Sequence, residues 1–195
     1  FGCIQSNWYQ ATCYSTVKNR TLEGDNYIMS ELLIGSGHRK KKFLPIGSHW
    51  TNVTTLDINP KCNPDVIHDL NVIPYPFDDA QFDEIHAYEV LEHCGTQGDF
   101  RFFFSQFDEF YRILKPNGVI YGSTPTYDSN WAWSDPGHTR IITRDTLSFL
   151  SQNMYINSQS EPTSDYREWY KGNFKLFFEK IESTTFIFGL KKLDI

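Results

Sequence analysis

The chain has 195 residues, which corresponds to one domain and is long enough to bury a sizeable core. Aromatic residues make up 16% of the sequence, which argues against a disordered chain, and a net charge of −6 argues against a nucleic-acid backbone as the main partner. The sequence shows no apolar run long enough for a membrane span, no recognisable secretory signal and no CxxC pair among its four cysteines, so we expect free thiols in a cytoplasmic protein.

The first 28 residues show no hydrophobic period and precede the first strong strand pattern. Residue 1 is Phe, and the first methionine is Met29. One interpretation is that residues 1–28 form an extension that acts as a lid over a binding site. The other is that Met29 is the natural start and that the preceding residues are not native. In both cases we expect the folded domain to span residues 29–195.

Short apolar runs that end at Gly, Pro or Asp follow one another along the chain and predict strands of a buried parallel sheet. These strands are expected at residues 32–34, 53–56, 66–67, 84–88 and 119–123.

Helical patterns separate or follow these strands. Phe103, Phe107 and Phe110 recur at helical spacing, and the turn residues 115–118 end that helix. Thr143 is suited to cap the start of another helix. Residues 174–178 and 185–190 predict a hairpin. The sequence therefore predicts a three-layer α/β domain whose mostly parallel sheet carries an antiparallel hairpin at its C-terminal edge.

Polar and small residues follow the expected strands, at the sheet edge where parallel α/β sheets bind ligands. Gly35, Ser36 and Gly37 come after the first strand, and Asp57 comes after the second. Glycines let a ligand approach the backbone closely, and a carboxylate at this place can accept both hydroxyls of a ribose. Lys40 stands where a dinucleotide motif would have its third glycine, and no GxxxxGK[ST] loop is present. The pattern therefore favours a nucleoside without phosphates.

Two segments carry a resemblance to a known family. Residues 70–93, LNVIPYPFDDAQFDEIHAYEVLEH, are similar to a family region written LPFPDxxFDxIxxxxVLEH, and residues 110–118, FYRILKPNG, resemble its ExxRVLKPGG turn. From Leu32 to Thr124, about half of the chain, the sequence resembles the class I S-adenosylmethionine-dependent methyltransferases of the small, type 11-like kind. The resemblance implies a Rossmann-like methyltransferase fold with S-adenosylmethionine as cofactor.

The resemblance also implies which residues bind that cofactor. The glycine loop would pass beneath its methionine part, Asp57 would hold its ribose, and Asp69 would read its adenine edge. The complete set that it implies is Gly35, Ser36, Gly37, Asp57, Ile58, Asp69, Leu70, Tyr88 and Glu89. Two features depart from the family. Leu33 stands where the family often has an acid that anchors the amino group of the cofactor, and Glu89 could replace that acid. The segment 38–52 is also short for the family's first helix.

Glu89, Glu92 and His93 form an ExxEH pattern, and on a helix these residues would share one face. His138 follows the fifth strand and could complete a site for a divalent metal ion. The pattern resembles Hen-type small-RNA 2′-O-methyltransferases and some ubiquinone-pathway O-methyltransferases. Glu89, His93 and His138 are the expected catalytic residues, with His138 also a candidate general base. The alternative is that the histidines only orient loops.

Two further features bear on the acceptor. Trp131 and Trp133 follow the fifth strand and would either stack on an aromatic or sugar acceptor or pack as a lid. The basic residues 39–42 would either meet phosphates or form a solvated helix face.

We expect a methyltransferase that modifies an oxygen or nitrogen of a small-molecule or saccharide-like acceptor. The alternatives are a non-catalytic nucleoside-binding module and an RNA-modifying enzyme with a metal-assisted 2′-O mechanism.

Overall fold

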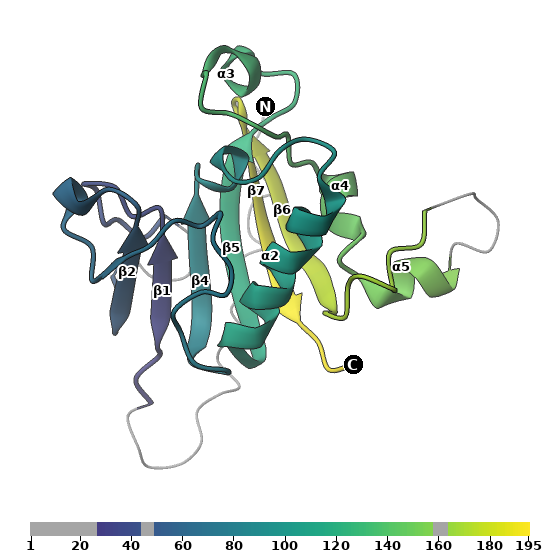
Figure 1. Cartoon of the computed structure of the whole chain (residues 1–195), viewed down its shortest axis with the longest axis horizontal. Helices are drawn as coiled ribbons and strands as arrows, with labels where there is room; N and C mark the ends of the chain where they lie inside the picture. The colour runs from purple at the N-terminus through teal and green to yellow at the C-terminus, as the bar shows by residue number, and fades with distance from the viewer. Residues whose placement is uncertain (1–26, 44–48, 158–163) are drawn as a thin grey trace, which may run out of the picture.

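A computed structural model describes residues 27–43, 49–157 and 164–195, which build a seven-stranded sheet in the order β3-β2-β1-β4-β5-β7-β6 (Figure 1). Neighbouring strands from β3 to β5 are parallel, and β7 is antiparallel to both β5 and β6. The strands are β1 (Glu31–Ile34), β2 (Val53–Asp57), β3 (Val66–Ile67), β4 (Phe82–Tyr88), β5 (Leu114–Pro125), β6 (Phe174–Glu182) and β7 (Thr185–Lys192). The predicted mostly parallel sheet with an antiparallel edge hairpin is confirmed.

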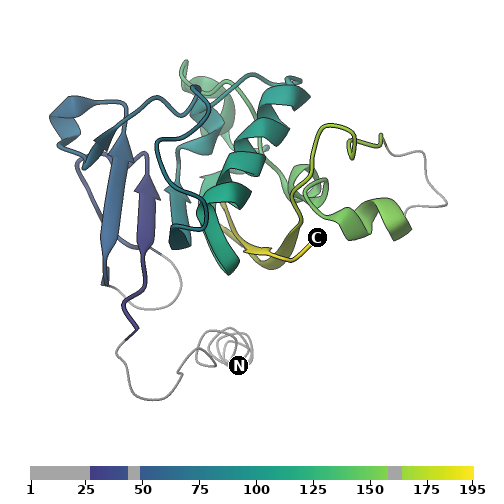
Figure 2. The same ribbon diagram turned by 60° about the horizontal axis from the view of Figure 1, so that its bottom comes forward.

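The long helix α2 (Phe100–Ile113) lies across one face of the sheet (Figures 1 and 2). It begins three residues before the predicted stripe because the carboxylate of Asp99 accepts the N–H of Phe102 and caps the first turn. Phe107 and Phe110 are fully buried and join the core with Ile85 of β4. The chain enters β5 directly after the helix, because Leu114 already pairs with Phe82. The predicted strand at 119–123 is therefore only part of β5.

The remaining helices are short. They are the 3₁₀ turns η1 (Pro60–Cys62) and η2 (Leu91–His93) and the α-helices α3 (Asn130–Ser134), α4 (Arg144–Ser148) and α5 (Gln152–Asn157). Thr143 caps α4 as predicted, and its side chain and that of Thr146 form a reciprocal capping box. α5 lies beyond the β6 edge of the sheet (Figures 1 and 2). Within the three described ranges, no helix is both long and apolar enough to cross a membrane.

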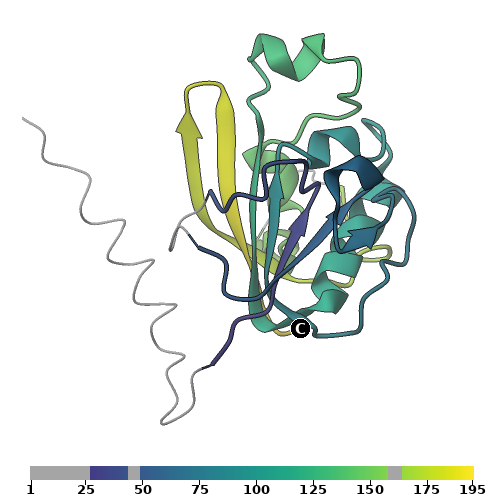
Figure 3. The ribbon, with the colours of Figure 1, turned by 90° about the vertical axis from the view of Figure 1, so that its left-hand side faces the viewer.

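The opposite face of the sheet is covered differently (Figure 3). Between β1 and β2 the described residues contain no helix, and an extended segment, residues 38–43, runs along this face instead. We call this segment the strap. The expectation of a solvated helix face for residues 39–42 is wrong in two respects, because these residues form no helix and Lys42 is buried, whereas residues 39–41 are exposed. In the described part of the first crossover, a strap therefore lies where a helix was expected.

The expectations for residues 1–28 fall almost entirely outside the described residues, which begin at Tyr27. Tyr27 donates its hydroxyl to Asp83 at 2.5 Å, and Lys115 and the N–H of Ser30 donate to the same carboxylate at 2.9 Å. Burial alone would raise the pKa of Asp83, but these donors outweigh it and hold the pKa below its ordinary value. The chain just before β1 is therefore tied to the start of β4.

Candidate cofactor and active site

The carboxyl ends of four parallel strands meet at one edge of the sheet. Ile34, the last residue of β1, pairs with Leu56 of β2 and with Ala87 of β4. Tyr88 at the end of β4 pairs with Ser123 of β5. The loops that follow these strands are consequently neighbours, as the sequence predicts, and the candidate site is built from them.

Asp57 is joined to the glycine loop by hydrogen bonds. The N–H of Gly37 donates to its Oδ2 and the N–H of Asn59 donates to its Oδ1, both at 2.8 Å. The side chain is held at the sheet edge and is only 9% exposed. Because each carboxylate oxygen has two acceptor positions, one on each oxygen remains for a pair of ligand hydroxyls. This orientation suits the predicted contact with a ribose.

The two glycines of the loop have different roles. Both have a positive φ, +59° at Gly35 and +54° at Gly37. A Cβ on Gly35 would lie 2.3 Å from Cγ2 of Val90, whereas a Cβ on Gly37 would meet nothing within 4 Å. Gly35 is therefore needed for packing against Val90, whereas the position of a Cβ on Gly37 is open. Ser36 between them is buried, and its Oγ has no hydrogen-bond partner among the described residues.

The residues predicted to surround adenine lie beyond β2 and β3, which pair as neighbours. Ile58 directly follows Asp57 and is 61% exposed. Asp69 is half-buried and accepts the backbone N–H and the side-chain amide of Asn71, both at 2.9 Å. Leu70 is buried, and its carbonyl accepts the hydroxyl of Tyr75 at 3.1 Å. An exposed apolar side chain thus lies next to Asp57 in the chain, and a carboxylate lies two residues beyond Ile67, which pairs with Asp57.

Tyr88 is the last residue of β4, and Glu89 follows it. The hydroxyl of Tyr88 lies 2.6 Å from Nδ1 of His86. Glu89 has a positive φ of 49° and turns toward β5, where its N–H donates to the carbonyl of Ser123 and its Oε1 accepts the Ser123 hydroxyl at 2.8 Å. Ser123 is therefore the residue that orients Glu89, a partner that the sequence did not identify.

Three of the four expected metal ligands come together. We call Glu92, His93 and His138 the Glu92 cluster; each offers one ligand atom, and these atoms all lie within 4.8 Å of one another. Glu89 is not part of this group, because residues 91–93 form the 3₁₀ turn η2 instead of the expected helix. The expectation that Glu89 shares one helix face with Glu92 and His93 is thus wrong.

The Glu92 cluster contains buried polar atoms that nothing in the described part of the chain satisfies. Glu92 is 2% exposed, and neither of its carboxylate oxygens has a hydrogen-bond partner there; the same holds for Nδ1 of His138. Burial, with a smaller contribution from the charge of Glu89, raises the pKa of Glu92 to about 8. His93 is exposed, its Nδ1 lies 3.0 Å from the carbonyl of Gly137, and its ring lies 4.6 Å from that of His138. A divalent cation would satisfy such a set of one carboxylate and two imidazoles.

Comparison with known proteins bears on the domain family and on the fold. The model of the methyltransferase domain family matches residues 32–122. A search of curated proteins finds no match.

Three solved structures illustrate the likeness in fold. A SAM-dependent methyltransferase from Archaeoglobus fulgidus is 15% identical with a TM-score of 0.52, and the alignment covers 94% of each chain. A complex that contains the Haloferax volcanii Trm112 methyltransferase activator matches at 14% identity and a TM-score of 0.52, over 93% of this chain and 89% of that one. The N-methyltransferase NodS from Bradyrhizobium japonicum in complex with S-adenosylhomocysteine matches at 12% identity and a TM-score of 0.53, over 98% and 91%. Residues 32–122 therefore carry a methyltransferase domain, and the fold of the chain is that of solved SAM-dependent methyltransferases.

Proposed function

We propose that the protein transfers the methyl group of S-adenosylmethionine to an oxygen or nitrogen of a small-molecule or saccharide-like acceptor, and that residues 29–195 form its catalytic domain. The observation that carries the cofactor part is the carboxylate of Asp57, fixed by the N–H of Gly37 with acceptor positions left on both oxygens. The free, buried thiols of Cys62 and Cys94 support a reducing, cytoplasmic environment.

The cofactor would extend along the shared strand edge. Asp57 would accept the ribose hydroxyls, and Ile58 and Asp69 would flank the adenine. The glycine loop would lie beneath the methionine part, with the open space at Gly37 facing it. Glu89 is the acid proposed to receive the amino group, because Leu33 offers no carboxylate there.

The reaction requires alignment more than covalent chemistry. A lone pair of the acceptor atom attacks the methyl carbon in line as the bond from that carbon to sulfur breaks, which leaves S-adenosylhomocysteine. The acceptor's proton must leave, and in a metal-free site His138 is the candidate base because its Nδ1 has no hydrogen-bond partner in the described residues. The protein's share is to orient the acceptor and to exclude water.

The proposed acceptor class is inferred from the side chains of α3. Trp131 and Trp133 are 68% and 72% exposed, so neither is packed as a lid on the core. The helix follows β5 and stands above the carboxyl ends of the strands (Figure 1). Aromatic rings in this place can stack on the face of a sugar or another ring. With a net charge of −6, the chain favours such an acceptor over a nucleic-acid backbone.

A divalent ion is a second part of the proposal. Glu92, His93 and His138 would hold it, because the Glu92 cluster presents a buried carboxylate and an imidazole nitrogen that lack partners among the described residues. When bound, such an ion lowers the pKa of a neighbouring acceptor hydroxyl. The open alternative is that the histidines orient the loop through Gly137.

The methyl-transfer proposal is tested by incubating the full chain with S-adenosylmethionine and a panel of saccharides, phenols and amines, and by quantifying S-adenosylhomocysteine by mass spectrometry. We expect release that depends on one acceptor class and on time. If the protein binds S-adenosylhomocysteine but turns over with no member of the panel, the non-catalytic binding module is the better description.

The metal proposal is tested by titrating chelator-treated protein with Mn²⁺ in a calorimeter. We expect saturable binding that weakens about tenfold or more in both Glu92→Gln and His138→Ala, because each variant removes a ligand. His68→Ala is the matched control, because His68 lies against Tyr75 outside the cluster and its loss should leave Mn²⁺ binding unchanged. Equal affinity in all variants, or no heat in the wild type, contradicts the site.

A further inference from the structure

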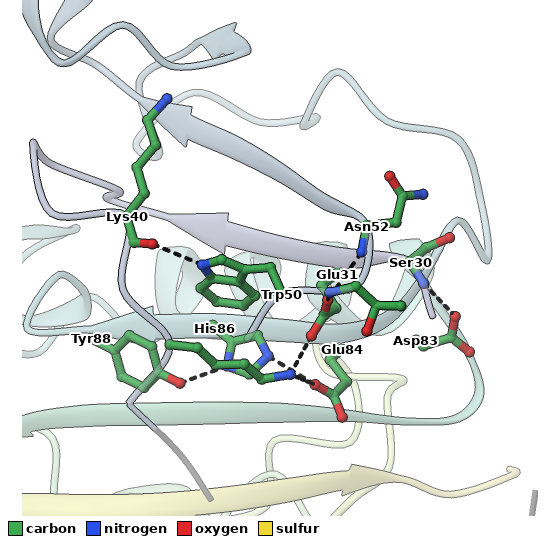
Figure 4. A network of polar contacts seen from close by, with 11 residues as sticks. Ser30, Glu31, Lys40, Trp50, Asn52, Asp83, Glu84, His86 and Tyr88 are labelled. Carbon is green, nitrogen blue, oxygen red and sulfur yellow. Dashed lines mark hydrogen bonds and ion pairs between the residues drawn. The ribbon is translucent and has the colours of Figure 1, made fainter. Parts of the chain in front are cut away.

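The sheet face under the strap carries buried charges instead of an apolar surface. Glu31 of β1 pairs in register with Glu84 of β4, and both side chains are at most 5% exposed. His86 and Tyr88 follow Glu84 at alternate positions and therefore lie on the same face. Figure 4 shows these side chains together beneath the segment that contains Lys40 and Trp50.

Lys42 of the strap supplies the counter-charge. Its Nζ donates to Oε1 of Glu31, and to Oε2 of Glu84 at 3.1 Å, while its own side chain is 5% exposed. Oε2 of Glu31 also accepts the N–H of Thr51 at 2.6 Å, where the chain returns toward β2. Buried carboxylates without a counter-charge are strongly unfavourable, so this ammonium binds the strap to the two central strands.

His86 extends the network to the end of β4. Its Nε2 lies 3.0 Å from Oε2 of Glu84, and its Nδ1 lies 2.6 Å from the hydroxyl of Tyr88 (Figure 4). Burial lowers the pKa of His86, which favours a neutral ring that donates to Glu84 and accepts from Tyr88. Trp50 covers this arrangement; its ring lies 4.9 Å from that of His86 and 5.3 Å from Nζ of Lys42.

Both ends of this network reach the candidate site. The strap begins at residue 38, directly after Gly37, whose N–H is bound to Asp57. Tyr88 is the last residue of β4 and precedes Glu89. We propose that Lys42 is a positioning residue for the cofactor: through Glu31 and Glu84 it holds the strap and the glycine loop, and through Glu84 and His86 it fixes Tyr88. This inference rests on the proposed cofactor-binding role of that loop.

The test compares Lys42→Met, Lys42→Arg and Lys41→Met in the full chain. Two quantities are measured: the affinity for S-adenosylhomocysteine by calorimetry, and the NMR signal of the Trp50 indole N–H, assigned with Trp50→Phe. That N–H donates to the carbonyl of Lys40 at 2.8 Å, so its signal reports whether the strap is docked.

We expect Lys42→Met to weaken binding about tenfold or more and to shift the Trp50 signal, because the loop loses its pre-organisation. Lys42→Arg keeps the positive charge and should restore most of the affinity. Lys41→Met is the matched control, because Lys41 is exposed on the same strap and should leave both readouts unchanged.

If Lys42→Met alone unfolds, a triple variant takes its place. It combines Lys42→Met with Glu31→Gln and Glu84→Gln, and we expect it to fold because it removes the three charges at once. We expect it to show the same loss of affinity. The proposal is overturned if either folded variant binds within about twofold of wild type, or if Lys42→Arg loses as much affinity as Lys42→Met. A wild-type chain that fails to bind S-adenosylhomocysteine contradicts the proposed cofactor site instead, so the two failures are distinguishable.

Discussion

Asp57→Ala is expected to reduce the affinity for S-adenosylhomocysteine about a hundredfold, or about 3 kcal/mol, as measured by isothermal titration calorimetry. The substitution removes the carboxylate proposed to bind the ribose hydroxyls, and hydrogen bonds to a charged acceptor are among the stronger ones. It also releases the N–H groups of Gly37 and Asn59, so the glycine loop loses its anchor.

Asp78→Ala is the matched control for this measurement. Asp78 is exposed, lies before β4 and is not part of the candidate site, so its loss should leave the affinity unchanged. Thermal unfolding of each variant shows whether it is folded. A folded Asp57→Ala protein that binds S-adenosylhomocysteine as tightly as the wild type would remove Asp57 from the proposed role.

Gly35→Ala is expected to lower the free energy of unfolding by about 3 kcal/mol, measured by chemical denaturation, because two costs add. The residue has a φ of +59°, which strains any residue with a Cβ, and that Cβ would lie 2.3 Å from Val90. Gly37→Ala carries only the first cost and should lower the free energy of unfolding by about 1 kcal/mol.

Gly37→Ala is also expected to weaken the binding of S-adenosylhomocysteine, although it is the more stable of the two glycine variants. A Cβ on Gly37 points into the open space assigned to the cofactor, so this milder variant should still bind S-adenosylhomocysteine poorly. Equal stability of the two variants would show that the contact with Val90 does not constrain the loop.

The sheet and the meeting of its strand ends could be predicted because they depend on local signals. The apolar runs of β1 and β2 end at Gly35 and Asp57, and parallel strands all end at the same edge. Asp57 therefore lies beside the glycine loop whatever the connecting segments do. Thr143 is predictable for a similar reason, since a cap is decided within the first turn of its helix.

The Glu92 cluster was predictable only in part. ExxEH spacing gives a shared face only on a regular helix, and the tighter 3₁₀ turn η2 together with the positive φ of Glu89 directs that side chain to Ser123. His138 joins Glu92 through a loop contact, in which the N–H of Thr139 donates to the carbonyl of Glu92. Spacing along the chain carries no information about such a contact.

Lys42 shows a different limit. Beside Arg39, Lys40 and Lys41 it resembles a solvated basic run, and nothing local distinguishes it from its neighbours. Its partners lie 11 residues away, at Glu31, and 42 residues away, at Glu84. One signal was available: in β4, polar residues at positions 84 and 86 alternate with apolar ones, which indicates that one face of the strand is polar.

The strap also has a consequence for how the family can diversify. A helix that packs on a sheet must match an apolar surface along several turns, which restricts many positions at once. Among the described residues of the first crossover, the contacts with the sheet face include an ammonium at Lys42 and an indole at Trp50. In homologues that keep these two side chains, the first crossover should tolerate substitutions and insertions. New segments that bind an acceptor can then arise beside the proposed nucleoside site without changes in the hydrophobic core.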